Sequence, residues 1–241
     1  MRTVTAGLTG VYAYLDDLIV ATETWVKHMI ALGALLDRLQ EYNLTANPKK
    51  CILGCSRVEY LGHDIGGGDF RPLSEQVKDI QQTPLPTSKT GIRSFLGAVG
   101  YYRRFVDNYA KLAGPLELMT KKGEPEKLIW TAERQDYFKQ LAIVLSLEPI
   151  LQLPNLKRPF VLRTDACDYG IGCALMQESN ANPLELHPVA YASRRLKGAE
   201  LNYSTIEKEA LAIVWSVEKF YRYLYGKHFE LHTDHKPLVY L

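Results

Sequence analysis

The sequence predicts a mixed α/β fold, of the α+β kind in the wider sense. Three observations support this prediction. The N-terminal part has an apolar hairpin pattern followed by a helical period, the middle has short helical pieces broken by proline and glycine, and the last third alternates strand, helix and strand. A length of 241 residues with 46% hydrophobic and 23% charged residues suits one or two globular domains.

A β-hairpin is predicted near the N-terminus. The apolar runs 11–15 and 18–21 are rich in aromatic and β-branched residues, and the adjacent carboxylates Asp16 and Asp17 separate them. Two neighbouring carboxylates repel each other unless cations share them, and Mg²⁺ prefers oxygen ligands. An Asp-Asp pair is also a common solvent-facing turn, and the dipeptide alone favours that interpretation. The flanking apolar residues favour buried strands that present an acidic tip.

The next segment is predicted to be helical and then to form short strands. Apolar residues keep a helical period over 26–39, and Pro48 prevents its continuation. Short strands are expected over 51–54 and 58–62. The glycine run 66–68 is expected to be a turn.

The middle of the chain is predicted to be a small helical module. From Ser74 the helical pattern comes in short pieces, and a further helix is expected after Thr131, whose side chain suits a helix cap. A connector over 149–159 then leads to a new domain that begins near residue 155.

The last third predicts a sheet with one long helix. Ser204 and Glu207 form a capping box, and apolar residues then follow one helix face to Gly226. A strand over 229–233 has Asp234 at its end. Three strands precede the helix, and they are expected over 160–164, 171–176 and 188–193.

Composition excludes several classes of protein. No run approaches the roughly 18 apolar residues of a membrane helix, and residues 1–10 lack the apolar core of a secretion signal. The expected setting is intracellular, in the cytoplasm or the nucleus, without a membrane partner. The cysteines Cys51, Cys55, Cys167 and Cys173 match neither a disulfide framework nor a zinc site, and they are predicted to be buried free thiols.

The net charge of +2 hides a basic segment between Pro84 and Lys122. Its cations are interleaved with aromatic residues, which suits a surface that follows phosphates and stacks on bases. A solvated helix face with its aromatic residues in the core explains the pattern equally well. The cations are Lys89, Arg93, Arg103, Arg104, Lys111, Lys121 and Lys122, against the anions Asp107 and Glu117, and the aromatic residues are Phe95, Tyr101, Tyr102, Phe105 and Tyr109.

Several motifs in order resemble the catalytic core of reverse transcriptases, and more closely the Pol protein of gypsy-type long-terminal-repeat retrotransposons. The resemblance covers nearly the whole chain. Residues 14–17 (YLDD) are similar to the family's palm motif with its paired metal-binding aspartates, and residues 47–51 to the lysine–cysteine element that follows. The other motifs are the primer-grip-like residues 60–63, the thumb-like segments 95–105 and 114–116, and three ribonuclease-H-like blocks at 164–172, 203–212 and 233–238.

The resemblance implies a polymerase site and a nucleic-acid-binding surface. Asp16 and Asp17 would hold Mg²⁺, with Mn²⁺ as an alternative, and Lys50 would be a general acid for the leaving pyrophosphate. The residues implied to contact nucleic acid are Leu61, Gly62, His63, Arg103 and Arg104. The family's third aspartate has no counterpart among the 15 residues before Asp16, and the fingers have none either. No DNA synthesis by this chain is therefore expected.

The resemblance also implies a ribonuclease H site. Asp165 on a strand, a glutamate on the long helix and Asp234 at a strand end would converge on two Mg²⁺ ions. Glu207 occupies the capping-box position, so Glu209 is predicted to be the metal ligand. The structural alternatives are a turn-initiating Asp165 and a capping Asp234. The family's fourth carboxylate has no counterpart before Leu241, so weak or undetectable cleavage is expected.

The resemblance further implies domains and partners. The expected domains are a partial palm over 1–82, thumb and connection over 83–154, and a ribonuclease-H-like domain over 155–241, as a fragment of a Pol polyprotein. The partners would be primer–template, RNA–DNA hybrid and nucleotides, with the protease and integrase segments of the same polyprotein. Two other interpretations stay open: a non-catalytic, decayed or domesticated nucleic-acid-binding remnant, and a fragmentary gene model.

Overall fold

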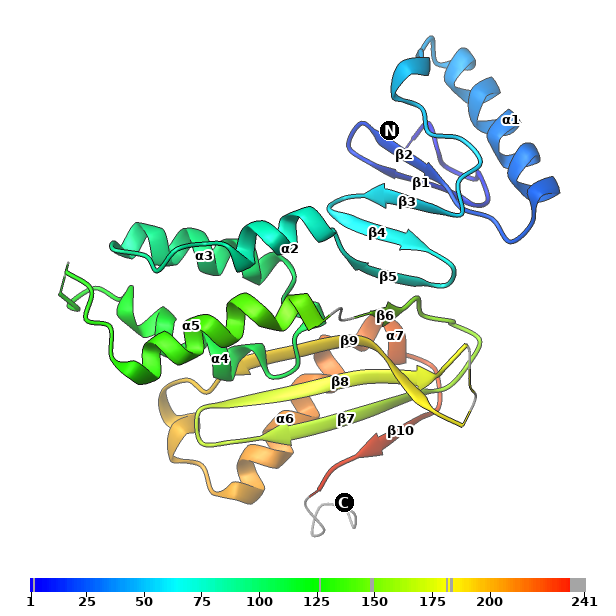
Figure 1. Cartoon of the computed structure of the whole chain (residues 1–241). Helices are drawn as coiled ribbons and strands as arrows, with labels where there is room; N and C mark the ends of the chain where they lie inside the picture. The colour runs from blue at the N-terminus through cyan, green and yellow to red at the C-terminus, as the bar shows by residue number, and fades with distance from the viewer. Residues whose placement is uncertain (2, 126, 148–149, 181, 183, 235–241) are drawn as a thin grey trace. The chain divides into compact units, whose positions relative to one another are not determined.

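The computed structural model describes residues 1, 3–125, 127–147, 150–180, 182 and 184–234. The chain divides into two compact units, Met1–Tyr60 and Leu61–Leu241 (Figure 1). The expected domain boundaries after residues 82 and 154 both fall inside the second unit, and they stay predictions.

The first unit is a hairpin packed on one helix, as predicted. β1 (Val11–Tyr14) and β2 (Asp17–Val20) are antiparallel, and α1 (Trp25–Glu41) follows them. Thr24 caps α1 because its side chain accepts a hydrogen bond from the Lys27 amide. The small core of the unit consists of Val4, Val11, Ala31, Leu35 and Leu39.

The strand expected after this helix is wrong. Residues 51–54 are irregular, and a 3-10 helix, η1 (Pro48–Lys50), precedes them. Proline fixes φ at the start of this helix, which favours a helical turn over an extended strand. The next strand is β3 (Arg57–Tyr60), inside the range expected for it apart from its first residue.

The prediction of buried cysteines is also wrong for two of them. Cys51 and Cys55 are exposed, since the loop that carries them lies outside the small core of the first unit. Cys167 is half-buried at the end of a strand, and Cys173 is buried within the main sheet of the second unit.

The second unit begins with a small sheet and the predicted helical module. The first two strands, which the sequence patterns did not predict, pair antiparallel on either side of the predicted glycine turn. The second of them also pairs with a distant third strand. Strand residues Phe70 and Leu151 share one core with the helices, so sheet and helices pack as one body. The elements are β4 (His63–Gly66), β5 (Asp69–Pro72), α2 (Ser74–Gln81), α3 (Lys89–Tyr101), η2 (Arg103–Phe105), α4 (Tyr109–Met119), α5 (Ala132–Val144), η3 (Leu145–Leu147) and β6 (Leu151–Gln152).

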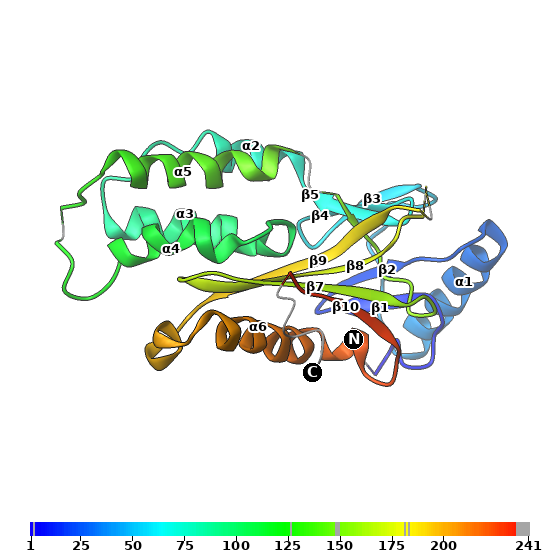
Figure 2. The same cartoon turned by 90° about the horizontal axis from the view of Figure 1, so that it is seen from below.

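A larger sheet with strand order β10-β7-β8-β9 completes the second unit. The three strands predicted before the long helix, β7, β8 and β9, are present and pair antiparallel, and β10 runs parallel to β7. Helix α6 covers one face of this sheet, and the α2–α5 helices lie on the other (Figure 2). The elements are β7 (Phe160–Ala166), β8 (Gly170–Glu178), β9 (Leu186–Arg195), η4 (Gly198–Asn202), α6 (Thr205–Lys219), α7 (Tyr221–Leu224) and β10 (Phe229–His232).

The long helix has the predicted start but not the predicted end. Ser204 and Glu207 form the capping box, whereas the helix expected to reach Gly226 breaks at Phe220, where α6 gives way to α7. Phe220, at the junction of α6 and α7, is buried in the core of the sheet. Among the helices that the structure describes, none combines the length and apolarity needed to span a membrane.

Candidate functional site

Asp16 and Asp17 lie at the tip of the β1–β2 hairpin. Tyr14 pairs with Asp17, so Leu15 and Asp16 form the turn, and Leu15 has a φ of +52°. This left-handed conformation is strained for a leucine, and such strain concentrates at functional sites. Burial raises the pKa of Tyr60, and the charges of Asp17 and Tyr14 raise it further, so this phenol lies beside the acidic tip.

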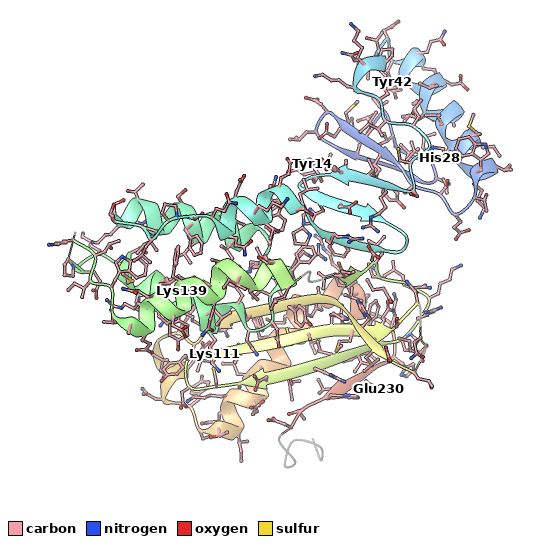
Figure 3. All side chains as sticks on the ribbon, viewed as in Figure 1. Tyr14, His28, Tyr42, Lys111, Lys139 and Glu230 are labelled. Atoms are coloured by element: carbon pink, nitrogen blue, oxygen red, sulfur yellow. The ribbon has the colours of Figure 1, made fainter. Side chains whose placement is uncertain are left out.

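The expectation that buried strands present this acidic tip is wrong. Both aspartates are exposed, and Tyr14 and Leu15 are 54% and 76% exposed (Figure 3, where Tyr14 is labelled). The core of the first unit is small, and of the hairpin it buries Val11 fully. Lys50, the candidate general acid, ends η1 and is exposed as well, so its role stays a prediction.

Asp165 lies on β7 and projects from the exposed face of that strand. Thr164 is buried and Asp165 exposed, which follows from the alternation of side chains along a strand. Asp165 is opposite Gly172 in the β7–β8 pair, so it belongs to the strand and not to the turn that follows it. The turn-initiating interpretation of Asp165 is therefore not supported.

Glu209 approaches Asp165 from α6, and it is 3% exposed. Its Oε1 accepts a hydrogen bond from the Ala166 amide at 3.3 Å, and its Oε2 is buried without a hydrogen-bond partner among the described residues. Burial raises the pKa of Glu209 to about 7, and the charges of Asp234 and Asp165 contribute to the rise. The buried carboxyl therefore faces two other acids.

The two glutamates of α6 have the separate positions that the capping argument predicts. Glu207 is exposed, and its Oε2 accepts hydrogen bonds from the Ser204 amide at 2.7 Å and the Ser204 hydroxyl at 2.8 Å. These bonds lower the pKa of Glu207. The capping role of Glu207 is confirmed, while Glu209 points to the strand that carries Asp165.

Asp234 follows β10, the strand that pairs with β7. His232 is opposite Arg163 in the parallel β10–β7 pair, so Asp234, two residues further along, comes to the level of Asp165. Asp234 is exposed, and its charge contributes to the raised pKa of Glu209. Residues 235–238 of the third ribonuclease-H-like block lie outside the described residues.

These three carboxyls suit a divalent cation by charge but do not form a closed cage. Within the part of the chain that the structure describes, no three His, Cys, Asp or Glu side chains are close enough to surround one metal ion. The partnerless Oε2 of Glu209 and the mutual repulsion of the acids nevertheless fit a cation between them, because a cation would relieve both.

The residues implied to grip a primer form a strained turn in the second unit. Leu61 and Gly62 both have positive φ, +47° and +69°. The Leu61 carbonyl accepts hydrogen bonds from the Tyr101 hydroxyl and His63 Nδ1, each at 2.6 Å, and the Gly62 carbonyl accepts one from the Tyr102 hydroxyl at 2.7 Å. The His63 ring stacks on Phe105 with ring centroids 5.5 Å apart, and burial lowers the pKa of His63.

The basic segment is mostly committed to internal contacts. Lys89 and Arg93 donate hydrogen bonds to backbone carbonyls just after α4, Arg103 donates to the Ser193 carbonyl at 3.0 Å, and Arg104 lies 4.7 Å above the Phe70 ring. Its aromatic residues are buried except Tyr101, which is 54% exposed. This packing favours the structural interpretation of the segment, and the role of Arg103 and Arg104 toward nucleic acid stays a prediction.

Two charged residues near the carboxyls were not among the predicted site residues. Asp107 lies near Asp165, whose charge adds to the burial that raises the pKa of Asp107. Lys208 forms an ion pair with Asp168 at 3.0 Å. Both interactions join parts of the chain that are distant in sequence, so no local sequence pattern predicts them.

Comparisons with known proteins agree with this layout. Residues 3–65 match the family model described as reverse transcriptase (RNA-dependent DNA polymerase), and residues 130–231 match the RNase H-like domain found in reverse transcriptase. Solved structures of the foamy viral protease-reverse transcriptase share the fold at 23% identity. The complex with dsDNA has a TM-score of 0.84, and the match covers 100% of this chain and 50% of that chain. The complex with RNA/DNA hybrid has a TM-score of 0.83, and the match covers 98% of this chain and 32% of that chain.

Curated relatives from Drosophila melanogaster match the chain along almost its whole length. The Retrovirus-related Pol polyprotein from transposon 297 is 38% identical over 95% of this chain and 21% of its own length. The corresponding polyprotein from transposon 412 is 37% identical over 100% of this chain and 19% of its own length. The one from transposon gypsy is 35% identical over 95% of this chain and 22% of its own length. The chain spans about a fifth of the length of these relatives. It belongs to the Pol polyprotein family of gypsy-type retrotransposons, an enzyme family, and carries a reverse transcriptase region and a ribonuclease-H-like domain.

Proposed function

We propose that this chain cleaves the RNA strand of RNA–DNA hybrids at a site formed by Asp165, Glu209 and Asp234. The observation that carries the proposal is the state of Glu209. This carboxyl is 3% exposed, its Oε2 is buried without a partner among the described residues, and its pKa is raised to about 7 beside two further acids. Such a strongly perturbed buried acid marks a functional site.

The residues divide the work of such a site between them. A Mg²⁺ ion held by these carboxyls, or Mn²⁺ in its place, would supply an activated water and would stabilise charge at the scissile phosphate. The Ala166 amide holds Oε1 of Glu209, which leaves Oε2 for the cation. Asp165 and Asp234 are exposed and therefore accessible from solvent to a phosphodiester. Glu209 must release its proton to bind a cation, so a pKa of about 7 makes cation binding depend on pH near neutrality.

We extend the proposal to the polymerase region. Asp16 and Asp17 would be two ligands of its catalytic cations, supported by the strained Leu15 at their turn, and Lys50 a general acid. The remaining nucleic-acid contacts would come from the Leu61–Gly62 turn with His63, Arg103 and Arg104. Primer–template, hybrid and nucleotides would be the substrates of the parent Pol polyprotein, whereas this chain by itself would not synthesise DNA. The protease and integrase segments of that polyprotein would be partners, and the cytoplasm or nucleus would be the setting.

The test compares the two neighbouring glutamates of α6 in the full chain. With protein in excess over a labelled hybrid and Mg²⁺ present, we expect slow RNA cleavage that Glu209→Gln and Asp165→Asn lower by about 100-fold or more, since each removes a cation ligand. The matched control is Glu207→Gln. It weakens the helix cap, because the Ser204 amide loses its carboxylate acceptor, and leaves cleavage in place.

The outcomes separate the competing interpretations. Cleavage that persists in Glu209→Gln and Asp165→Asn contradicts the assigned site. Binding of the hybrid without cleavage by the unaltered chain favours the non-catalytic nucleic-acid-binding interpretation instead.

A further inference from the structure

We infer that Lys208 and Asp168 are a positioning pair that fixes the distance between the strand end carrying Asp165 and the helix carrying Glu209. The inference rests on the proposed function of that site and adds two residues to it. Lys208 Nζ lies 3.0 Å from Asp168 Oδ1, across 40 positions of sequence. The Lys208 side chain is 11% exposed and the Asp168 side chain 85% exposed, so a nearly buried lysine side chain pairs with an exposed carboxylate in the turn.

The turn that holds Asp168 is firmly connected to Asp165. It joins β7 to β8, and the Cys167 amide closes it with a hydrogen bond to the Gly170 carbonyl at 2.9 Å. Only Ala166 and Cys167 separate Asp165 from Asp168. A displacement of the turn therefore moves the end of β7 with it.

Two neighbouring residues of α6 hold this hairpin end at two points. Glu209 accepts the hydrogen bond from the Ala166 amide at 3.3 Å, and Lys208 pairs with Asp168. The hydrogen bond from the Ala166 amide to Glu209 is long, and the other oxygen of this carboxyl must stay free for a cation. This hydrogen bond by itself therefore holds the strand end weakly. The ion pair of Lys208 is the second contact, and it keeps the Ala166 amide within hydrogen-bonding distance of Glu209.

The burial of Lys208 argues for a geometric role. A charged side chain that is 11% exposed loses part of its hydration, and an apolar residue of similar length would pack at this place without that loss. Ala212, one turn further along α6, is fully buried against Ile171 and Leu196, so apolar packing already attaches the helix to the sheet here. What the ion pair adds is a fixed position for the turn. Residues that orient metal ligands from behind commonly affect metal affinity in this way.

The test replaces Lys208 in the full chain and follows a readout that needs no metal. Lys208→Met keeps the length and the apolar stem of the side chain, and Lys208→Arg restores the charge. The matched control is Lys227→Met, because Lys227 donates to the Leu156 carbonyl at 2.8 Å and lies 5.5 Å from the Phe160 ring, at the opposite end of β7. We expect exchange of the Ala166 amide with solvent to become about tenfold faster in Lys208→Met, and to stay unchanged in Lys208→Arg and in the control.

A second arm measures the response to Mg²⁺ alone. The Mg²⁺ concentration that gives half of the rise in melting temperature is expected to increase about tenfold in Lys208→Met and to recover in Lys208→Arg. Asp168→Asn combined with Lys208→Met is expected to be no worse than Lys208→Met, since the two residues act as a unit.

The two arms separate failure of the inference from failure of the proposed site. Unchanged exchange at Ala166 in Lys208→Met overturns the positioning role, and so does an unchanged Mg²⁺ dependence where the unaltered chain responds to Mg²⁺. An unaltered chain that shows no response to Mg²⁺ counts against the proposed site, and the exchange result then still decides the role of the pair.

Discussion

The two acidic sites of this chain differ in how the fold holds them. Asp16 and Asp17 lie at the exposed tip of a hairpin in a unit whose core has five buried residues. Asp165 and Glu209 are held by a four-stranded sheet and α6, around fully buried residues such as Leu162 and Leu175. One site is an exposed tip with little packing behind it, and the other has its central carboxyl buried.

This difference teaches what positions a carboxylate. A hairpin tip fixes its side chains through the backbone of the turn, and here that backbone is strained at Leu15. At the second site, packing buries Glu209 beside other acids and changes its pKa. The raised pKa of Glu209 therefore depends on the packing of the larger sheet and α6. The contrast between the two sites leads to three predictions.

The largest effect is expected from the cores behind the two sites. Leu162→Ala removes a fully buried side chain from the larger sheet and should lower the free energy of unfolding of the second unit by about 3–5 kcal/mol. Leu35→Ala in the first unit should cost less, about 2–3 kcal/mol, because a small core collapses more readily around the cavity. Hydrogen exchange at increasing denaturant concentration measures the free energy of unfolding of each unit separately. An equal loss of this free energy in the two variants would contradict the contrast between the two cores.

A smaller effect is expected from the pH dependence of stability. The pKa of Glu209 is raised to about 7 on folding, so the folded state holds its proton more tightly than the unfolded state. Its contribution to stability is complete below about pH 4.5 and is lost as the pH rises to about 7. Relative to Glu209→Gln, the unaltered chain should lose on the order of 1–2 kcal/mol over this window, because solvent at the exposed acids screens part of the repulsion.

Denaturation with urea at pH 4.5, 6 and 8, without divalent metal, measures this difference for both variants. Asp16→Asn, at the exposed tip of the hairpin, serves as the comparison from the first unit. A constant difference between Glu209→Gln and the unaltered chain at all three pH values would contradict the burial argument.

The smallest effect is expected at the hairpin. Leu15→Gly should stabilise the first unit by about 0.5–1 kcal/mol, because glycine adopts a φ of +52° without strain and the leucine is 76% exposed. Asn43 has the same φ, and Asn43→Gly is the control, since asparagine tolerates this conformation and should gain little. A loss of stability in Leu15→Gly would show that the exposed leucine packs more than its exposure suggests.

Local patterns in the sequence predicted most elements and one site assignment. Periodicity and caps predicted α1, α5, the start of α6 and the strands of the larger sheet, because each depends on neighbours within a few residues. The capping box likewise separated Glu207 from Glu209. The patterns failed at 51–54, an irregular segment after the helical turn that Pro48 starts, and at Phe220, where α6 gives way to α7.

The sequence by itself determined the family, the order of the motifs and the identity of the acidic residues, since these are written in consecutive residues. Only the tertiary structure decided which side chains are buried, and with them the pKa of Glu209, the pairing of Lys208 with Asp168 and the internal use of Lys89, Arg93 and Arg103. Burial and long-range contacts depend on which distant segments meet in space. A cation in the sequence has the same letter whether it faces a phosphate or a backbone carbonyl.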